Sequence, residues 1–262
     1  MQNFQEEGHP EGHDYVPGSP HLRHEHLRSQ IVQSISDITE SIRLTQGSCR
    51  VLEVGAGHGV FTESLLRSGA TVVVTEMSAP SAAHLQRLYG HRTNVEVIHD
   101  PTGEWLSRSD SLFDAVICIS VLHHIPDYLG FLDTVFAHIK PGGAFVSWQD
   151  PLWYPRRSRG NLAADKGAYF AWRMTQGQLR NGLRTRLRRL RGIYDVTNPA
   201  DMVEYHVVRA GVDELAICNL GERFFQSTEV VRYWSTQAAV LQRLGHRMRL
   251  ESTFGLSFTQ RR

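Results

Sequence analysis

A glycine-rich stretch flanked by two acidic residues carries the clearest chemical signal in the sequence. Its glycines occupy alternate positions directly after the apolar run 51–54: Gly55, Gly57 and Gly59. Glycine lets a backbone turn tightly and approach a ligand closely. Glu76 ends a second, β-branched run about twenty residues further on, where an acidic side chain can hold a ribose diol in a doubly wound α/β domain. This pattern favours a nucleoside site over a purely structural turn.

The glycine spacing distinguishes between two classes of nucleoside cofactor. A dinucleotide fingerprint spaces its glycines G-x-G-x-x-G and places a pyrophosphate at the start of a helix. Here the spacing is G-x-G-x-G, and Glu53 precedes the first glycine by two residues. A carboxylate at this position would repel a diphosphate but could accept a hydrogen bond from an ammonium group. The spacing therefore favours a cationic nucleoside that bears an amino acid.

Residues 51–62 resemble motif I of the class I S-adenosylmethionine-dependent methyltransferases, in which the acidic residue lies near the methionine moiety. The stretch 113–148, with its Leu-His-His-Ile-Pro and Lys-Pro-Gly-Gly sequences, is similar to the same family. Together the matches cover residues 47–150. The resemblance implies that S-adenosylmethionine is the cofactor and that Asp100, just past the third strand, contacts the adenine. The implied cofactor-binding residues are Glu53, Gly55, Ala56, Gly57, Gly59, Glu76, Met77, Asp100, Pro101 and Ser120.

Three side chains are candidates for the base that a hydroxyl acceptor requires. His123 and His124 follow the fourth strand, and Asp150 follows the fifth. Ligands bind at the carboxyl ends of the strands in open α/β sheets, and histidine titrates near neutral pH. Two adjacent histidines cannot both point at one atom, so one of them is expected to be structural. A divalent metal held by Asp150 and either histidine, which would polarise the hydroxyl, remains an alternative.

Hydrophobic periodicity predicts an α/β fold. The resemblance implies that its sheet is doubly wound, seven-stranded, mostly parallel and Rossmann-like, with a helical lid insertion between strands 5 and 6. Predicted strands cover 51–54, 71–75, 95–98, 113–119 and 144–148, with a turn at 141–143. An amphipathic helix over 24–44 ends at Gly47. The resemblance implies that runs 228–235 and 253–259 form an antiparallel pair, with the last strand inserted between the fifth and the sixth.

Composition divides the chain into four segments. Residues 1–22 are rich in Gly, Pro, His and Glu and are predicted to be a disordered tail or a lid. Residues 23–150 form the cofactor-binding core, and residues 151–198 form a basic, aromatic helical lid. Residues 199–262 complete the core, with a helix over 200–212 that continues for about a dozen residues before the strand pair.

The insertion has two compatible interpretations. Its residues 152–192 carry eleven Lys and Arg against one acidic residue, Asp165, while the whole chain has a net charge of +1. A leucine stripe over 179–190 could dock on the core while the arginines extend into water. The insertion could also cover the acceptor with its aromatic residues. The candidate acceptor-binding residues are Trp153, Tyr154, Tyr169 and Trp172.

These features predict an S-adenosylmethionine-dependent methyltransferase that acts on a hydroxyl of a small acceptor, such as a sugar, a glycolipid precursor or a polyketide. The alternatives are an RNA methyltransferase that uses the arginine-rich insertion, a small-molecule N- or C-methyltransferase, and a binding protein without turnover. Outside the insertion the chain is acidic, which argues against a nucleic-acid partner. With no apolar segment of about 18 residues and three scattered cysteines, we expect a soluble cytoplasmic protein, and a homodimer remains an open alternative.

Overall fold

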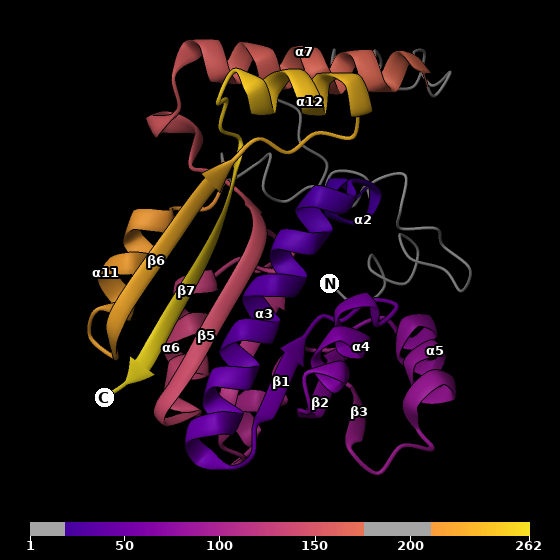
Figure 1. Cartoon of the computed structure of the whole chain (residues 1–262), viewed down its shortest axis with the longest axis vertical. Helices are drawn as coiled ribbons and strands as arrows, with labels where there is room; N and C mark the ends of the chain where they lie inside the picture. Colours follow the sequence, from indigo (N-terminus) through magenta and orange to yellow (C-terminus); the bar gives the residue numbers. More distant parts are fainter. Residues whose placement is uncertain (1–18, 176–210) are drawn as a thin grey trace.

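A seven-stranded sheet forms the centre of the molecule (Figure 1). The computed structural model describes residues 19–175 and 211–262. The spatial order of the strands is β3-β2-β1-β4-β5-β7-β6, and β7 runs antiparallel to both of its neighbours, as predicted. The strands are β1 (Arg50–Val54), β2 (Thr71–Glu76), β3 (Val95–His99), β4 (Phe113–Ile119), β5 (Ile139–Pro151), β6 (Phe225–Tyr233) and β7 (Thr253–Arg261).

Helices cover both faces of the sheet, because its central strands are apolar on both sides. One face packs against α3 (Glu25–Gln46), α4 (Val60–Arg67) and α5 (Ala79–Tyr89). The other face packs against α6 (Tyr128–Ala137) and α11 (Glu214–Gly221). The short helix α2 (Pro20–Arg23) precedes α3. Two further helices, α7 (Arg159–Thr175) and α12 (Ala239–Arg247), lie beyond the end of the sheet toward which β6 points (Figure 1).

The core consists of two hydrophobic clusters, one on each face of the sheet. Every residue of β4 is buried, as its continuous apolar run predicts. Alternate residues of this strand contribute to opposite clusters: Ile117 packs with the α3 face, and Val116 and Cys118 pack with the α6 face. At about 25 cal/mol per Å² of buried apolar surface, these side chains hold the central strands rigidly. The loops that follow β1 and β4 therefore begin at fixed positions.

Two predictions about the elements are wrong, and one helix was missed. Residues 141–143 do not form a turn before the fifth strand, because they already lie within β5, which begins at Ile139. They lie in an irregularity between the pairs Phe113↔Ile139 and Ala115↔Ala144. The helix predicted over 200–212 lies outside the described residues up to 210, and Val212 is not helical but forms a parallel bridge with Leu152. Its predicted continuation does contain a helix, α11. Helix α12 was not predicted. The leucine stripe at 179–190 lies outside the described residues.

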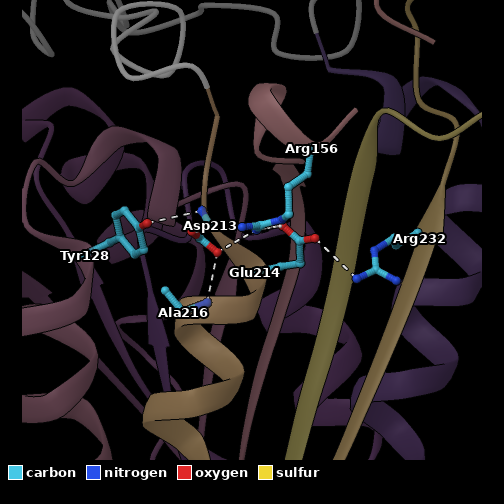
Figure 2. A network of polar contacts seen from close by, with 6 residues as sticks. All are labelled: Tyr128, Arg156, Asp213, Glu214, Ala216 and Arg232. Atoms are coloured by element: carbon cyan, nitrogen blue, oxygen red, sulfur yellow. Dashed lines mark hydrogen bonds and ion pairs between the residues drawn. The ribbon is translucent and has the colours of Figure 1, made fainter. Parts of the chain in front are cut away.

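Polar contacts join the two chain segments on either side of residues 176–210 (Figure 2). Arg156, in the 3₁₀ helix Tyr154–Arg156 that follows β5, donates hydrogen bonds to both carboxylate oxygens of Asp213 and to Oε2 of the buried Glu214. Arg232 of β6 donates to the other oxygen of Glu214 at 3.3 Å. The guanidinium of Arg156 is also the main reason that the pKa of Asp213 lies below its usual value. The chain segment that follows β5 is therefore fixed to the segment that precedes α11.

Further contacts of the backbone stabilise the same junction between the two segments. The N–H of Val212 donates to the carbonyl of Pro151 at 2.9 Å, and the Tyr128 hydroxyl accepts from the N–H of Asp213 at 3.1 Å. Gly211 has a φ of +93°, and a Cβ there would lie 2.2 Å from the carbonyl oxygen of Leu152. Only glycine fits so close to another backbone, which explains why the chain re-enters the core at this residue.

Candidate active site

The glycine loop between β1 and α4 has the geometry that its sequence predicts. Gly55, Gly57 and Gly59 all have positive φ, at +67°, +57° and +80°. A Cβ at Gly59 would meet Tyr89 at 2.8 Å and Leu85 at 2.9 Å, so this glycine allows α4 to begin directly against α5. A Cβ at Gly57, in contrast, would meet nothing within 4 Å. A Cβ at Gly55 would lie 3.0 Å from Val121, so the loop packs closely at both ends and leaves space over its middle.

Glu76 is held against the middle of this loop. Its Oε2 accepts a hydrogen bond from the N–H of Gly57 at 2.9 Å, and its Oε1 accepts from the N–H of Ser78 at 2.9 Å. Burial raises the pKa of this carboxyl, and the backbone donors counteract that effect. Each carboxylate oxygen has two lone pairs, so both can accept a second hydrogen bond from a vicinal diol. These residues therefore fit the ribose of S-adenosylmethionine.

Glu53 lies beneath the same loop and is 2% exposed. Its Oε2 accepts a hydrogen bond from the hydroxyl of Thr62 at 2.5 Å. Burial raises the pKa of the Glu53 carboxyl to about 8, and the nearby charge of Glu76 adds to this rise. A buried carboxyl with a raised pKa favours a cationic partner, because a positive charge stabilises the ionised form. The chemistry suits the ammonium group of an amino acid.

The remaining predicted cofactor residues lie at the ends of β2, β3 and β4. Asp100 follows β3, and its carboxylate accepts from the N–H groups of Glu104 and Trp105 at 3.2 and 3.1 Å. It therefore organises its own loop, which begins with Pro101. The end of the Met77 side chain would lie 3.4 Å from a Cβ at Gly103 of that loop. Ala56, within the glycine loop, is half-buried.

Two residues other than glycine adopt positive φ at the carboxyl ends of adjacent strands. Ser120 after β4 has a φ of +62°, and Gln149 near the end of β5 has a φ of +68°. The N–H of Ser120 donates to the carbonyl of Trp148 at 2.7 Å, which links the two positions. Such backbone conformations cost of the order of 1–3 kcal/mol and concentrate at functional sites. They mark this edge of the sheet independently of any side-chain chemistry.

His123 and Asp150, predicted separately as candidate bases, form a hydrogen-bonded pair at this edge. Nδ1 of His123 lies 2.8 Å from Oδ1 of Asp150, and the N–H of His123 donates to the same oxygen at 3.1 Å. Oδ2 accepts from the hydroxyl of Ser147 at 2.7 Å. Asp150 is fully buried. An ionised carboxylate can only accept, so the proton on Nδ1 belongs to His123, and the neutral imidazole carries its lone pair on Nε2.

This pairing distinguishes the three candidates by their contacts. In this geometry Asp150 can orient the ring of His123 and stabilise its charged form. The half-buried His124 lies beside His123, with the ring centroids 4.0 Å apart and the ring planes tilted by 44°. Within residues 19–175 and 211–262 there is no group of three or more His, Cys, Asp or Glu side chains that could hold a metal ion. Chemically, an imidazole paired with a carboxylate in this way can accept a proton.

The four predicted acceptor-binding aromatics fall into two pairs. Trp153 and Tyr154 directly follow β5, and the guanidinium of Arg157 lies 5.5 Å from the centre of the Tyr154 ring. Tyr169 and Trp172 lie together on α7, with ring centroids 5.8 Å apart. Both pairs therefore belong to the first part of the insertion, beyond the strand that carries Asp150.

Sequence reasoning missed several residues that support the candidate site. Thr62 holds Glu53, Ser147 holds Asp150, and Gln149 adopts the strained backbone beside it. A threonine in a helix and a serine in a strand carry no distinctive signal. Ser147 and Asp150 are three residues apart, a separation that places side chains on opposite faces of a regular strand. Only the tertiary structure shows that they meet.

Comparison with known proteins agrees with the fold. The family model described as "Methyltransferase domain" matches residues 22–184, more than half of the chain. The ubiquinone biosynthesis O-methyltransferase of Xylella fastidiosa is 34% identical over 110 residues, which cover 41% of this chain and 44% of that protein. A protein of the same name from Xanthomonas oryzae pv. oryzae is 34% identical over 105 residues, or 39% and 44% of the two chains. The match thus spans less than half the length of these relatives.

A solved structure extends the likeness to the whole fold. The N-methyltransferase NodS from Bradyrhizobium japonicum, in complex with S-adenosyl-L-homocysteine, superposes with a TM-score of 0.55 and covers 99% of both chains at 13% identity. At this identity the likeness concerns the fold alone. The chain belongs to the methyltransferase domain family, and the predicted class, a methyltransferase with a Rossmann-like fold that uses S-adenosylmethionine, is confirmed. Among the described residues, no helix is long and apolar enough to cross a membrane.

Proposed function

We propose that this chain transfers the methyl group of S-adenosylmethionine to a hydroxyl oxygen of a small-molecule acceptor, with His123 as the general base. The observation that carries the proposal is the 2.8 Å hydrogen bond between His123 and the buried Asp150. An alcohol or phenol must lose a proton during methylation, whereas a neutral amine already has a nucleophilic lone pair. A carboxylate-backed imidazole at the cofactor edge of the sheet is therefore suited to oxygen acceptors.

The cofactor would be held by the loop and strand ends described above. Glu76 would accept hydrogen bonds from the ribose hydroxyls, and Glu53 would face the ammonium group. The backbone around Gly57 would lie against the nucleoside, and Asp100 would lie near the adenine. When bound, S-adenosylmethionine supplies an electrophilic methyl group whose carbon–sulfur bond breaks with both electrons going to sulfur. Asp150 holds the His123 ring in place, and Nε2 accepts the proton of the acceptor hydroxyl.

The acceptor class follows from the residues beyond β5. Trp153, Tyr154, Tyr169 and Trp172 provide flat apolar surfaces for a ring-shaped acceptor. A phenolic ring, a sugar ring or a cyclic polyketide fits this description. The two relatives that match part of the chain are named O-methyltransferases, which supports oxygen as the atom that receives the methyl group.

The proposal is tested by methyl transfer from radiolabelled S-adenosylmethionine to a panel of hydroxyl acceptors, namely catechols, phenols and methyl glycosides, beside a matched panel of amines. We expect methylation of a hydroxyl compound, with a rate that rises with pH. His123→Gln should lower kcat by about 10²–10⁴-fold, because a positioned base contributes about that much. His124→Gln serves as the control and should have the smaller effect.

Two results would overturn the proposal. The first is methylation confined to the amine panel. The second is an unchanged kcat for His123→Gln when S-adenosylhomocysteine still binds with wild-type affinity. In the second case the cofactor site would stand and only the assignment of the base would be wrong.

A further inference from the structure

The position of Asp150 depends on an irregularity in β5. Along one face of the sheet, Phe145 pairs with Phe258 of β7, and Ser147 pairs with Leu256. On the opposite face, Trp148 pairs with Gly255. The next pair is Asp150↔Phe254, and Gln149 stands outside the register. Gln149 is therefore a β-bulge, one extra residue in the strand.

This bulge transfers Asp150 from one face of the sheet to the other. In a regular strand, alternate residues share a face, so Asp150 would lie with Trp148 on the α3 side. Because Gln149 is extra, Asp150 instead shares the face of Ser147. Only on this face can Oδ2 accept the 2.7 Å hydrogen bond from Ser147 and Oδ1 meet His123. Leu152 follows the same changed alternation and packs in the core cluster that contains Phe145.

A tyrosine from a distant part of the chain stabilises the bulge. The N–H of Gln149 donates to the hydroxyl of Tyr233 at 3.1 Å, and that hydroxyl donates to Oε1 of Gln149, also at 3.1 Å. Nε2 of Gln149 donates to the hydroxyl of Ser235 at 2.7 Å. The Tyr233 ring, which is buried, packs on Trp148 with centroids 5.6 Å apart. These contacts offset the cost of the positive φ and satisfy an N–H that stands outside the ladder.

We propose that Gln149 and Tyr233 are positioning residues for the His123–Asp150 pair. The Tyr233 hydroxyl holds the bulge, the bulge sets the face on which Asp150 lies, and Asp150 orients His123. This inference rests on the proposed function for its effect on turnover. Its structural claim concerns one hydrogen bond, and that bond can be observed without any acceptor.

The first test observes the His123–Asp150 hydrogen bond directly. In protein labelled with ¹⁵N-histidine, an Nδ1 proton held by a carboxylate gives a downfield NMR signal, assigned to His123 by its absence in His123→Gln. Tyr233→Phe removes the hydroxyl and keeps the ring, and we expect it to broaden or abolish this signal. The control is Tyr128→Phe, which also removes a buried hydroxyl that accepts from a backbone N–H at 3.1 Å. It should lower the melting temperature similarly and leave the signal unchanged.

A pair of substitutions at Gln149 tests the bulge itself. Gln149→Gly accommodates the positive φ and keeps the N–H that reaches Tyr233, so the signal should persist. Gln149→Val strongly disfavours that φ, so the signal should disappear even if the protein folds. If Gln149→Val does not fold, Gln149→Gly and Tyr233→Phe decide the question. A normal His123 signal in a folded Tyr233→Phe protein would overturn the inference.

Kinetics distinguish this inference from the proposed function. With the best hydroxyl acceptor, Tyr233→Phe should lower kcat roughly 10–100-fold, part of what a base contributes, with little change in the acceptor KM. The acidic limb of its pH–rate profile should move to lower pH, because a carboxylate partner stabilises the charged imidazole. If His123→Gln proves inactive but Tyr233→Phe keeps both the signal and the wild-type profile, only the positioning claim fails. If Tyr233→Phe loses the signal but turnover is unchanged, the base assignment fails.

Discussion

The glycine loop after β1 and the bulge in β5 both bring an acidic side chain to the carboxyl edge of the sheet, but they do so by different means. In the loop, positive φ angles occur at glycines, and Glu76 contacts Gly57, 19 residues away in the sequence. In the bulge, the positive φ occurs at Gln149, which is held by Tyr233, 84 residues away. The loop follows from local sequence, whereas the bulge requires an assembled sheet.

From this comparison we infer that the two regions have different functions. The loop and its two glutamates have the properties of a cofactor site, and the bulge and its aspartate have those of a catalytic site. If the division holds, substitutions in one region should leave the property of the other region intact. The following predictions test it.

The largest effect is expected for Asp150→Asn. An amide in place of the carboxylate cannot stabilise a charged His123, so kcat should fall by about 10²–10⁴-fold while the Kd for S-adenosylhomocysteine stays within about twofold. Steady-state kinetics and calorimetry measure the two quantities. A large loss of cofactor affinity would contradict the division between the regions.

A matched control for this substitution is Asp114→Asn at the opposite end of β4. Asp114 is also buried, and it accepts hydrogen bonds from the N–H of Arg50 at 2.7 Å and from Lys140 at 2.8 Å. This control should lower stability and leave kcat unchanged, which separates a specific effect at the site from the general cost of altering a buried aspartate.

The next effect in size is expected for Glu76→Ala. The substitution removes the acceptor of two backbone hydrogen bonds, one from Gly57 in the loop and one from Ser78 after β2, and the expected partner of the ribose hydroxyls. Hydrogen bonds to a charged group contribute about 1.5–3 kcal/mol each, so affinity for S-adenosylhomocysteine should fall about 10²-fold or more in calorimetry. Glu63→Ala, which alters a more exposed carboxylate of α4, is the control. The NMR signal of His123 should be unaffected, and wild-type affinity would refute the assignment of the cofactor pocket.

The smallest effect is expected for Glu53→Gln, which should change how the stability of the fold depends on pH. Burial raises the pKa of Glu53 from 4.5 to about 8 in the folded chain, so unfolding near neutral pH releases a proton. The contribution of this group to stability is therefore fully present below about pH 4.5 and is lost as the pH rises toward 8. Urea unfolding should show a wild-type stability that declines over this range relative to Glu53→Gln.

The same group gives a second readout in cofactor binding. A cofactor ammonium favours the ionised form of Glu53, so binding to the wild type at pH 7 should release protons, and binding to Glu53→Gln should release fewer. Calorimetry in two buffers with different enthalpies of ionisation measures this difference. Equal proton release by both proteins would place the ammonium group elsewhere.

Helix α12 was missed although its period is present in the sequence. Its exposed apolar residues Val240 and Leu244, and Met248 just past its end, recur every four residues, which is helical spacing. The buried side chain is instead the polar Gln242, which accepts from the N–H of Thr236 at 2.8 Å and donates to the carbonyl of Trp234 at 2.8 Å. Periodicity predicts the helix, but only the tertiary structure shows which of its sides is buried.

The elements that could be predicted are those whose signal is local. The continuous apolar run of β4, the α3 stripe that ends at Gly47 with a φ of +81°, and the three glycines of the loop each report their own conformation. The family and its cofactor follow from these stretches, because a strand, a glycine turn and an acidic strand end lie close together in the chain. Glu76 was identified for the same reason.

The tertiary structure alone decided that His123 and Asp150 pair with each other and where Asp150 lies. The alternation of side chains along a strand would place Asp150 on the wrong face, and nothing near Gln149 in the sequence indicates an extra residue in the ladder. The Tyr233 hydroxyl that satisfies the Gln149 N–H comes from another strand. A contact between segments so far apart exists only when the sheet is complete, so its consequences cannot be read from any single stretch of the chain.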